Sequence, residues 1–420
     1  MEKLRWLNPV VVIACLLWHA YSVWFVWGFV GGETGAADFA SYYYAAEHAL
    51  DGGNPYDTAA LNALAERMGR GLGAVQPFFY PPPFLLFIAW APAMELSQAY
   101  HVWFWINEVL LLAVVVSIFL WWRRDIGPAL PALLALSFSF APTLFNLSLG
   151  QVNLPVMLAV VWALALSQKK KPIASGCLMG VACMAKMSPA LFVAWWMLRG
   201  RWKEVGVACG SAVVLSLVAL PMIGIEHQVH FYREVLPGFA TGDYNGLAVP
   251  ITLWKNYSLP SLYHHWLPGD AGLSSGARAL SSLTSLALLV GLGWCFRRPG
   301  DEFGRHAQVA AVAIATLLIP VFTYEHHLLW AALALAVTGG AITRGRLSRG
   351  WAPLLALAVM TLGANPTWLR VGYDALRAAE LDSLAFLVQE AKLFSLLLLG
   401  GLSLWLGSAP REEPATPGSP

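Results

Sequence analysis

Long apolar runs alternate with short polar segments along most of this chain. The runs lie at about 6–30, 84–97, 102–122, 128–147, 152–168, 172–198, 204–225, 246–263, 277–296, 307–322, 327–342, 351–364 and 384–407. A run of about 20 apolar residues is long enough to cross a bilayer core of about 30 Å as a helix. The pattern therefore predicts an all-α, polytopic integral membrane protein with about 11–13 transmembrane helices.

Two runs do not fit a single straight crossing. The run 84–97 is short and contains Pro92. If it crossed the membrane, the Arg123–Arg124 pair would emerge on the opposite side from the other basic clusters, so we expect a short, re-entrant or strongly tilted segment. The run 172–198 is longer than one span, and Met187-Ser188-Pro189 marks the expected break of a helix pair.

One long polar segment, residues 30–83, interrupts the apolar pattern. It contains six acidic residues, Glu33, Asp38, Glu47, Asp51, Asp57 and Glu66, and two basic residues, Arg67 and Arg70. Translocated loops are poor in Lys and Arg, so this segment is the expected first extracytoplasmic loop. Within it, we expect short interfacial helices, one of them over 39–50, and a turn at the Gly-Gly-Asn-Pro sequence that begins at Gly52.

Basic residues gather in short clusters between the apolar runs. The clusters are Lys3/Arg4, Arg123/Arg124, Lys169 to Lys171, Arg199/Arg201/Lys203, Arg297/Arg298 and Arg344/Arg346/Arg349. The positive-inside rule places such clusters on the cytoplasmic side. The pattern thus predicts one multi-pass domain over 1–407 with both termini cytoplasmic. Residues 408–420, rich in Pro, Glu and Gly, are expected to form a disordered cytoplasmic tail.

The composition agrees with a membrane protein and argues against several other classes of protein. Hydrophobic residues make up 58% of the chain, charged residues 12%, and the mean hydropathy is +0.59, which excludes a soluble globular domain. A net charge of +2 gives no indication of a nucleic-acid partner. The five cysteines lie inside apolar runs and are expected to be buried thiols. The chain contains no glycine-rich phosphate loop, nucleophile elbow or HExxH motif, and we expect neither a metal ion nor a cofactor.

The same topology brings several polar segments to one side of the membrane. They are Leu149 to Asn153, Lys186 to Pro189, Gly242 to Gly246 and Tyr324 to His327, and all fall on the side of Asp38. Polar residues at membrane depth are costly, so their convergence indicates a functional site that faces the extracytoplasmic side.

Asp38 is the candidate catalytic residue. A partly desolvated carboxylate beside aromatic rings would have a raised pKa and could take a proton from a sugar hydroxyl. The alternative role is an N-cap for the helix 39–50, which Asp also favours. The aromatic candidates for substrate binding are Tyr42, Tyr43 and Tyr80. Tyr80, in a Phe-Phe-Tyr-Pro-Pro-Pro sequence, either lines a sugar or isoprenoid groove or belongs to an aromatic belt.

Two amides and a lysine stand at interruptions of apolar runs. Gln151 and Asn153 either hydrogen-bond sugar hydroxyls or join helices to one another. Lys186 is a lone cation in an apolar run, and it requires an anionic partner. That partner is either a lipid phosphate or a Glu or Asp of a neighbouring helix.

The adjacent histidines His326 and His327 open an apolar run. Their side chains would point about 100° apart on a helix, so both are not expected to bind one metal ion. One of them is expected to donate to a phosphate oxygen or to share a proton with a carboxylate. Glu325, next to this pair, and Asn245 complete the candidate substrate-binding residues.

Several of these motifs occur together in one known family. They are Asp38 with the Tyr-Tyr-x-Ala-Ala run, Gly-Gly-Asn-Pro-Tyr-Asp, Tyr-Pro-Pro-Pro-Phe, Gly-Gln-Val-Asn, Lys186 before Ser-Pro-Ala-Leu-Phe, and His326-His327. In this order they resemble glycosyltransferase family 87 over about residues 6–342. Members of that family are integral-membrane C-type glycosyltransferases, several of which are polyprenyl-phosphate-mannose-dependent α-mannosyltransferases.

The resemblance implies a C-type helical bundle and a specific chemistry. A hexose, with mannose as the first expectation, would move from a polyprenyl phosphate to a lipid or glycan acceptor of the cell envelope, with inversion and without a nucleotide. By resemblance, Asp38 matches the catalytic carboxylate, while Lys186, His326 and His327 match positions near the donor phosphate. The chain departs from the family pattern before the histidines, where Thr323-Tyr324-Glu325 stands in place of Ser-Trp.

Two other classes of function also fit a membrane protein that has polar groups at membrane depth. One is a transporter or flippase of lipid-linked glycans, and the other is a non-catalytic partner in envelope assembly. Transporters often consist of two repeated halves with interrupted helices at matching positions. This chain shows no such repeat, because the acidic segment 30–83 has no counterpart in the second half.

Overall fold

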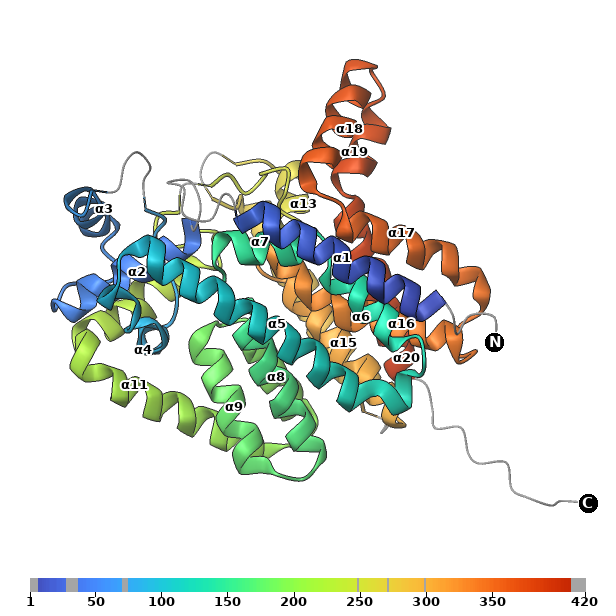
Figure 1. Ribbon diagram of the computed structural model, residues 1–420, viewed down its shortest axis with the longest axis horizontal. Coiled ribbons are helices and arrows are strands. Elements are labelled where there is room, and N and C mark those ends of the chain that lie inside the picture. Colours follow the sequence, from blue (N-terminus) through green and yellow to red (C-terminus); the bar gives the residue numbers. More distant parts are fainter. Residues whose placement is uncertain are drawn as a thin grey trace, which may run out of the picture.

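The computed structural model describes residues 7–27, 37–69, 75–247, 249–269, 272–297 and 300–408. These residues form helices and loops and contain no strand (Figure 1), so the all-α prediction is confirmed. The expected tail after Ser408 and the residues 28–36 that begin the polar segment lie outside the described residues. The single-domain assignment for 1–407 stays a prediction.

Six helical segments among the described residues are long and apolar enough to cross a membrane. They are α1 (Leu7–Trp27), α5 (Leu96–Ile126), α11 (Trp202–His230) with its continuation, α14 (Ser275–Cys295), η5 (Glu325–Trp330) with α16 (Ala331–Thr343), and α20 (Ala391–Ser408). The polytopic prediction is therefore confirmed.

Two bent helix pairs raise the number of spans to eight if each pair crosses once. They are α6 (Leu130–Phe138) with α7 (Ala141–Leu149), bent by 48°, and α17 (Ala352–Gly363) with α18 (Pro366–Ala378), bent by 102°. This number is below the expected 11–13, because other apolar runs form helices shorter than a full span. These are α8 (Asn153–Gln168), α9 (Pro172–Ala185), α10 (Ala190–Leu198) and α15 (Glu302–Leu318).

The segment 82–93 does not cross the membrane as one straight helix. It consists of three short turns, η2 (Pro82–Phe84), α4 (Leu85–Ile88) and η3 (Ala91–Ala93), which agrees with the expected short segment. The chain therefore returns to its starting side along α5. Accordingly, Asn8 at the start of α1 donates a hydrogen bond of 2.6 Å to the carbonyl of Pro128, just after α5.

The apolar run 172–198 is broken as the sequence predicts. Helix α9 ends at Ala185 and α10 begins at Ala190, with Lys186 in extended backbone between them. The polar segment also folds as expected, into α2 (Ala37–Leu50) and α3 (Thr58–Arg67), joined by a turn in which Gly52 has φ +80°.

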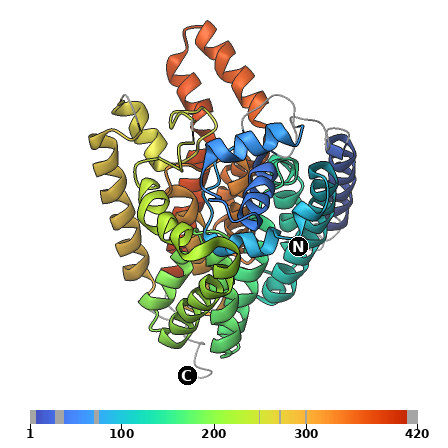
Figure 2. The same ribbon diagram turned by 90° about the vertical axis from the view of Figure 1, so that its left-hand side faces the viewer.

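The remaining elements are short or lie outside the spans. They are η4 (Phe231–Val235), α12 (Leu236–Gly238), α13 (Leu259–Trp266), η6 (Arg349–Trp351) and α19 (Asp382–Gln389). Figure 2 looks onto the end of the molecule that carries α2, with α14 on one flank and α1 on the opposite flank.

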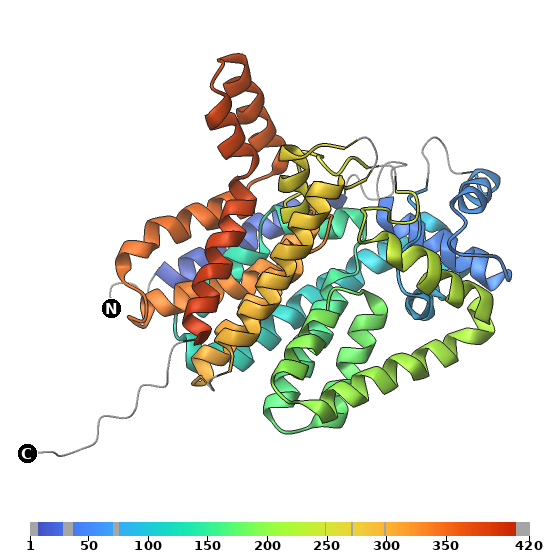
Figure 3. The ribbon, with the colours of Figure 1, turned by 180° about the vertical axis from the view of Figure 1, so that it is seen from behind.

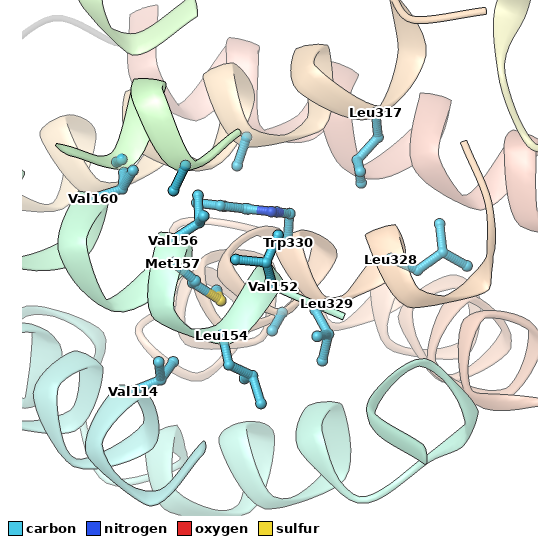
Figure 4. Close-up of a cluster of buried hydrophobic side chains, with 14 of the residues drawn as sticks. Val114, Val152, Leu154, Val156, Met157, Val160, Leu317, Leu328, Leu329 and Trp330 are labelled. Carbon is cyan, nitrogen blue, oxygen red and sulfur yellow. The ribbon is translucent and has the colours of Figure 1, made fainter. Parts of the chain in front are cut away.

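The interior of the bundle is apolar and centres on Trp330 and its neighbours. Figure 4 shows this residue among Val156, Met157 and Leu317, which come from α8 and α15. All four side chains are buried. The core therefore fixes η5 against α8 and α15, and η5 also carries Glu325, His326 and His327 at its start.

Candidate active site

A cavity of about 760 Å³ opens where the polar segments of the chain meet. Its lining combines α2, the α7–α8 and α9–α10 connections, the loop before α13, α14 and η5. Of the residues singled out from sequence, those that line the cavity are Asp38, Tyr80, Gln151, Lys186, Glu325, His326 and His327. The structure thus brings together residues that are almost 290 positions apart in the chain.

Asp38 lies in the first turn of α2 and reaches the cavity. Because α2 begins at Ala37, Asp38 is not in the N-cap position of a helix over 39–50. Among the described residues, its side chain accepts a hydrogen bond of 2.7 Å at Oδ2 from Nε2 of Gln151. Burial raises the pKa of Asp38, although this hydrogen bond and the positive charges of Lys186 and Lys255 act in the opposite direction.

Gln151 is held in one orientation by two tyrosines. The hydroxyl of Tyr42 donates to that of Tyr80 at 2.7 Å, and Tyr80 donates to Oε1 of Gln151 at 3.2 Å. Because the amide oxygen receives these hydroxyls, the amide nitrogen faces Asp38 as a donor. Tyr42 itself is buried behind Tyr80 and does not line the cavity.

A glycine allows Gln151 to come this close to α2. Gly150 ends α7 in the left-handed conformation, with φ +68°. A Cβ at this position would lie 2.6 Å from Cβ of Phe39, the residue after Asp38. Any side chain at Gly150 would therefore push Gln151 away from Asp38.

Lys186 lines the cavity beside a neutral partner, and burial lowers its pKa to about 7, while the carboxylate of Asp38 acts in the opposite direction. Its Nζ donates to Oδ1 of Asn153 at 2.7 Å. No carboxylate among the described residues forms an ion pair with it. Asn153 is buried outside the cavity, and its Nδ2 donates to the backbone carbonyl of His326. Asn153 therefore ties the cation to the histidine segment.

The two histidines lie against each other, with ring centroids 4.2 Å apart. Nδ1 of His327 accepts a hydrogen bond of 2.9 Å from the backbone N–H of Tyr324. In the neutral ring the proton must then reside on Nε2, which makes Nε2 a donor. Both rings line the cavity, so His327 can offer this donor to an anionic ligand.

Glu325 has a structural partner within the bundle. Its Oε1 accepts from Nζ of Lys392 at 2.6 Å, and its Oε2 accepts from the hydroxyl of Tyr257 at 3.0 Å. The Lys392 side chain is 0% exposed and also donates to the carbonyl of Ala364 at 2.7 Å. These contacts with Lys392 and Tyr257 anchor Glu325 at the start of η5.

Two other predicted substrate-binding residues point away from the cavity. The hydroxyl of Tyr43 donates to the carbonyl of Met94. Asn245 has a left-handed backbone with φ +57°, and its Nδ2 donates to the carbonyls of Tyr56 and Phe78. Both residues join loops around the cavity.

The sequence analysis missed two cations that line the cavity, Lys255 and Arg278. Lys255 interrupts the apolar run 246–263 in the way that Lys186 interrupts its own run, so the same argument would have found it. Arg278 stands at the start of α14. Below it on this helix, Ser281, Ser282 and Ser285 also line the cavity.

The described residues contain no group of three or more His, Cys, Asp or Glu side chains that could hold a metal ion. The groups that face the cavity are instead the carboxylates of Asp38 and Glu325, several basic side chains, two imidazoles and aromatic rings. Such an arrangement can remove a proton with Asp38 and bind a negatively charged group with Lys186 and His327.

A model of glycosyltransferase family 87 matches residues 78–323, which is more than half of the chain. The chain belongs to glycosyltransferase family 87. The resemblance inferred from the motifs is therefore confirmed. The matched range includes Tyr80, Gln151 and Lys186, whereas the two histidines lie just after its end and Asp38 lies well before its start.

Curated relatives extend the similarity over most of the chain. A polyprenol-phosphate-mannose-dependent alpha-(1-2)-phosphatidylinositol mannoside mannosyltransferase of Mycolicibacterium smegmatis is 26% identical, over 83% of this chain and 79% of its own length. A polyprenol-phosphate-mannose-dependent alpha-(1-2)-phosphatidylinositol pentamannoside mannosyltransferase of Mycobacterium tuberculosis is 28% identical over 47% of this chain. The similar region spans only 42% of that relative's length. No solved structure matches the chain.

Proposed function

We propose that this protein is an inverting mannosyltransferase that takes mannose from a polyprenyl phosphate. Asp38 acts as the general base, and the acceptor is a lipid or glycan of the cell envelope. The observation that carries the proposal is the single cavity shared by Asp38, Lys186 and the two histidines. The activities for which these relatives are named support the polyprenol-phosphate-mannose donor and a phosphatidylinositol mannoside acceptor.

The proposed reaction needs one base and one anion-binding group. The acceptor hydroxyl gives its proton to the carboxylate of Asp38, while its oxygen forms a bond to the anomeric carbon. The bond from that carbon to the phosphate oxygen breaks at the opposite face, and polyprenyl phosphate leaves with the electron pair. Phosphate leaves without being protonated, so the pair of carboxyl groups that glycoside hydrolases use is not required.

Lys186 and His327 are placed to bind the leaving phosphate. Lys186 has no carboxylate partner among the described residues, so its charge is available to an anionic ligand. Nε2 of His327 offers a hydrogen-bond donor with a fixed tautomer. Donors that are already oriented stabilise charge as it develops on the leaving group, without reorganising during the reaction.

The hydrogen bond from Gln151 gives Asp38 the properties that a base requires. Burial alone would favour the protonated carboxyl, which cannot accept a proton. The amide N–H of Gln151 and the nearby lysine charges favour the ionised form. This hydrogen bond therefore opposes the rise in the pKa of Asp38 and favours the form that can accept a proton.

The basic clusters support an active site on the extracytoplasmic side of the cytoplasmic membrane. Arg344 donates to the backbone carbonyl of Arg124, and Arg346 forms an ion pair with Asp301. The ends of α5 and α16 next to these clusters lie together, away from α2 (Figure 1). By the positive-inside rule these ends face the cytoplasm.

A transfer assay with purified protein tests the proposal. Polyprenyl phosphate carrying radiolabelled mannose is incubated with the protein and a membrane lipid extract, and the lipid products are separated. We expect label to move to a new lipid or glycan product, and Asp38→Asn to abolish this transfer. Label that stays on the polyprenyl phosphate with every acceptor fraction would contradict the proposal.

A further inference from the structure

The hairpin formed by α18 and α19 projects from the bundle. Figures 1 and 3 show it rising away from the body, beyond the end of α17. Helix α17 is apolar, and α18 leaves it at an angle of 102° after the residues Ala364 and Asn365. The hairpin returns to the bundle at α20, which is long and apolar enough to span the membrane.

Helix α18 has a sharply divided surface. Trp368 and Val371 lie on one face, and their exposed fractions are 67% and 65%. Arg370, Asp374 and Arg377 follow one another at helical spacing on a charged face, which lies opposite Trp368 and borders Val371. A helix with a large exposed apolar face and a charged opposite face is typical of segments that lie in a membrane interface.

Helix α19 adds a second exposed apolar surface. Leu384 and Leu387 are three residues apart and therefore lie on one side of this helix, and both are exposed. The two helices pack against each other, yet this contact leaves the apolar side chains of both uncovered. The hairpin thus carries more apolar surface than its own packing uses.

Contacts at its base fix the direction of the hairpin. Nζ of Lys392 donates to the carbonyl of Ala364, at the bend between α17 and α18. The guanidinium of Arg370 lies 5.9 Å above the ring of Trp254, and Gln389 forms a hydrogen bond of 3.1 Å with His265. The direction in which the hairpin points is therefore part of the fold.

We propose that the α18–α19 hairpin lies in the lipid–water interface of the leaflet on the side of the cavity. The bend of 102° places α18 across the direction of the apolar helix α17. Both ends of the hairpin are held at that level by α17 and α20. In this position Trp368 and Val371 enter the acyl region, while Arg370 and Arg377 remain among the headgroups.

The charges on the hairpin indicate what holds it in the interface. Arg370 pairs with Asp374 at 3.0 Å, and Arg377 pairs with Asp382 at 2.6 Å. Residues 366–389 contain two bases and three acids, counting Glu380. Since the bases are already paired and the net charge is slightly negative, burial of apolar side chains holds the hairpin, and attraction to anionic lipids contributes little.

Site-directed fluorescence on the full chain in lipid nanodiscs tests this placement. In a chain whose cysteines have been replaced, Val371→Cys and Arg377→Cys are labelled separately with an environment-sensitive dye. We expect dye at 371 to emit at shorter wavelength, to be quenched by nitroxide-labelled lipids and to be shielded from iodide. Dye at 377, on the charged face, should respond to iodide and respond less to the lipid nitroxide.

A second pair on α19 and a change of lipid complete the test. Leu387→Cys should behave like Val371→Cys, and Asp382→Cys like Arg377→Cys, so the outcome does not depend on one variant. Replacing zwitterionic lipid by anionic lipid should leave the quenching nearly unchanged. Equal access of iodide to both faces, or disulfide cross-linking at 371 between two copies, would overturn the proposal.

Discussion

The side-chain amide of Gln151 donates a hydrogen bond of 2.7 Å to the carboxylate of Asp38, across 113 positions of sequence. Its carbonyl oxygen is occupied by the hydroxyl of Tyr80, so the amide cannot turn round without losing both contacts. These contacts orient the carboxylate, and the donated hydrogen bond opposes the rise in pKa that burial causes.

Gln151→Leu should lower the rate of transfer by about 10- to 100-fold, since a hydrogen bond to a charged group contributes about 1.5–3 kcal/mol. Without this donor the pKa of Asp38 rises further, so the acidic limb of the pH–rate profile should move to higher pH. Gln168→Leu is a matched control, because Gln168 bonds to Trp121 away from the cavity. An unchanged pH profile would show that Gln151 does not act on Asp38.

Lys186→Met should raise the donor KM strongly while the protein remains monodisperse. The substitution removes the charge proposed to bind the phosphate and leaves only the neutral amide of Asn153 without its partner. Lys203→Met, an exposed position on α11, is the control. If Lys186→Met aggregates during purification, the lysine holds the fold together and the assignment to the phosphate fails.

His327→Ala should remove most of the activity, whereas His326→Ala should retain much of it. Only His327 has its proton placed on Nε2 by a hydrogen bond from the backbone of Tyr324. His326 holds Asn153 through its backbone carbonyl, which the substitution leaves in place. Steady-state transfer rates of the two variants test this difference, and equal tolerance of both changes would exclude the histidines from the site.

The buried pair of Glu325 and Lys392 should contribute to stability more than to chemistry. Lys392→Met alone should lower the free energy of unfolding by about 3–5 kcal/mol, because it leaves an uncompensated buried carboxylate. The double variant Glu325→Gln with Lys392→Met should recover most of this loss and most of the activity. Thermal unfolding and transfer assays on these two variants test this expectation, since a stable but inactive double variant would mean that Glu325 contacts substrate.

The membrane class and the region of the site follow from hydropathy and charge alone. Both predictions depend on the free-energy cost of placing polar groups in lipid, which is large enough to outweigh local structural preferences. This is why Asp38, Gln151, Lys186 and the two histidines emerged from the sequence and line one cavity. The same argument applies to Lys255, which the sequence analysis overlooked.

The direction of individual side chains and the length of individual helices could not be predicted from the sequence. Asn153 and Asn245 are polar residues beside the cavity, yet both turn away from it to bind backbone carbonyls. The partner of Glu325 is Lys392, which lies in the last helix and has no sequence signal that links it to Glu325. The number of crossings was overestimated relative to the six to eight spans found, because apolar runs also form short buried helices such as α8 and α9.

The role of Asp38 also has a consequence for stability. Because burial raises its pKa, the folded protein binds this proton more tightly than the unfolded chain does. Stability due to Asp38 is therefore lost as the pH rises through the raised pKa, while the fraction of active base increases over the same range. At neutral pH Asp38→Asn should unfold at the same temperature as the wild type or at a higher one, whereas loss of a helix cap would cost about 1 kcal/mol.

The most direct test of the central claim is the rate of mannosyl transfer by purified Asp38→Asn at saturating donor. The amide keeps the shape of the side chain and can still accept from Gln151, but it cannot take the acceptor proton. Loss of a general base should lower the rate by about 100- to 10,000-fold with the fold intact. Transfer by Asp38→Asn at nearly the wild-type rate would contradict the account.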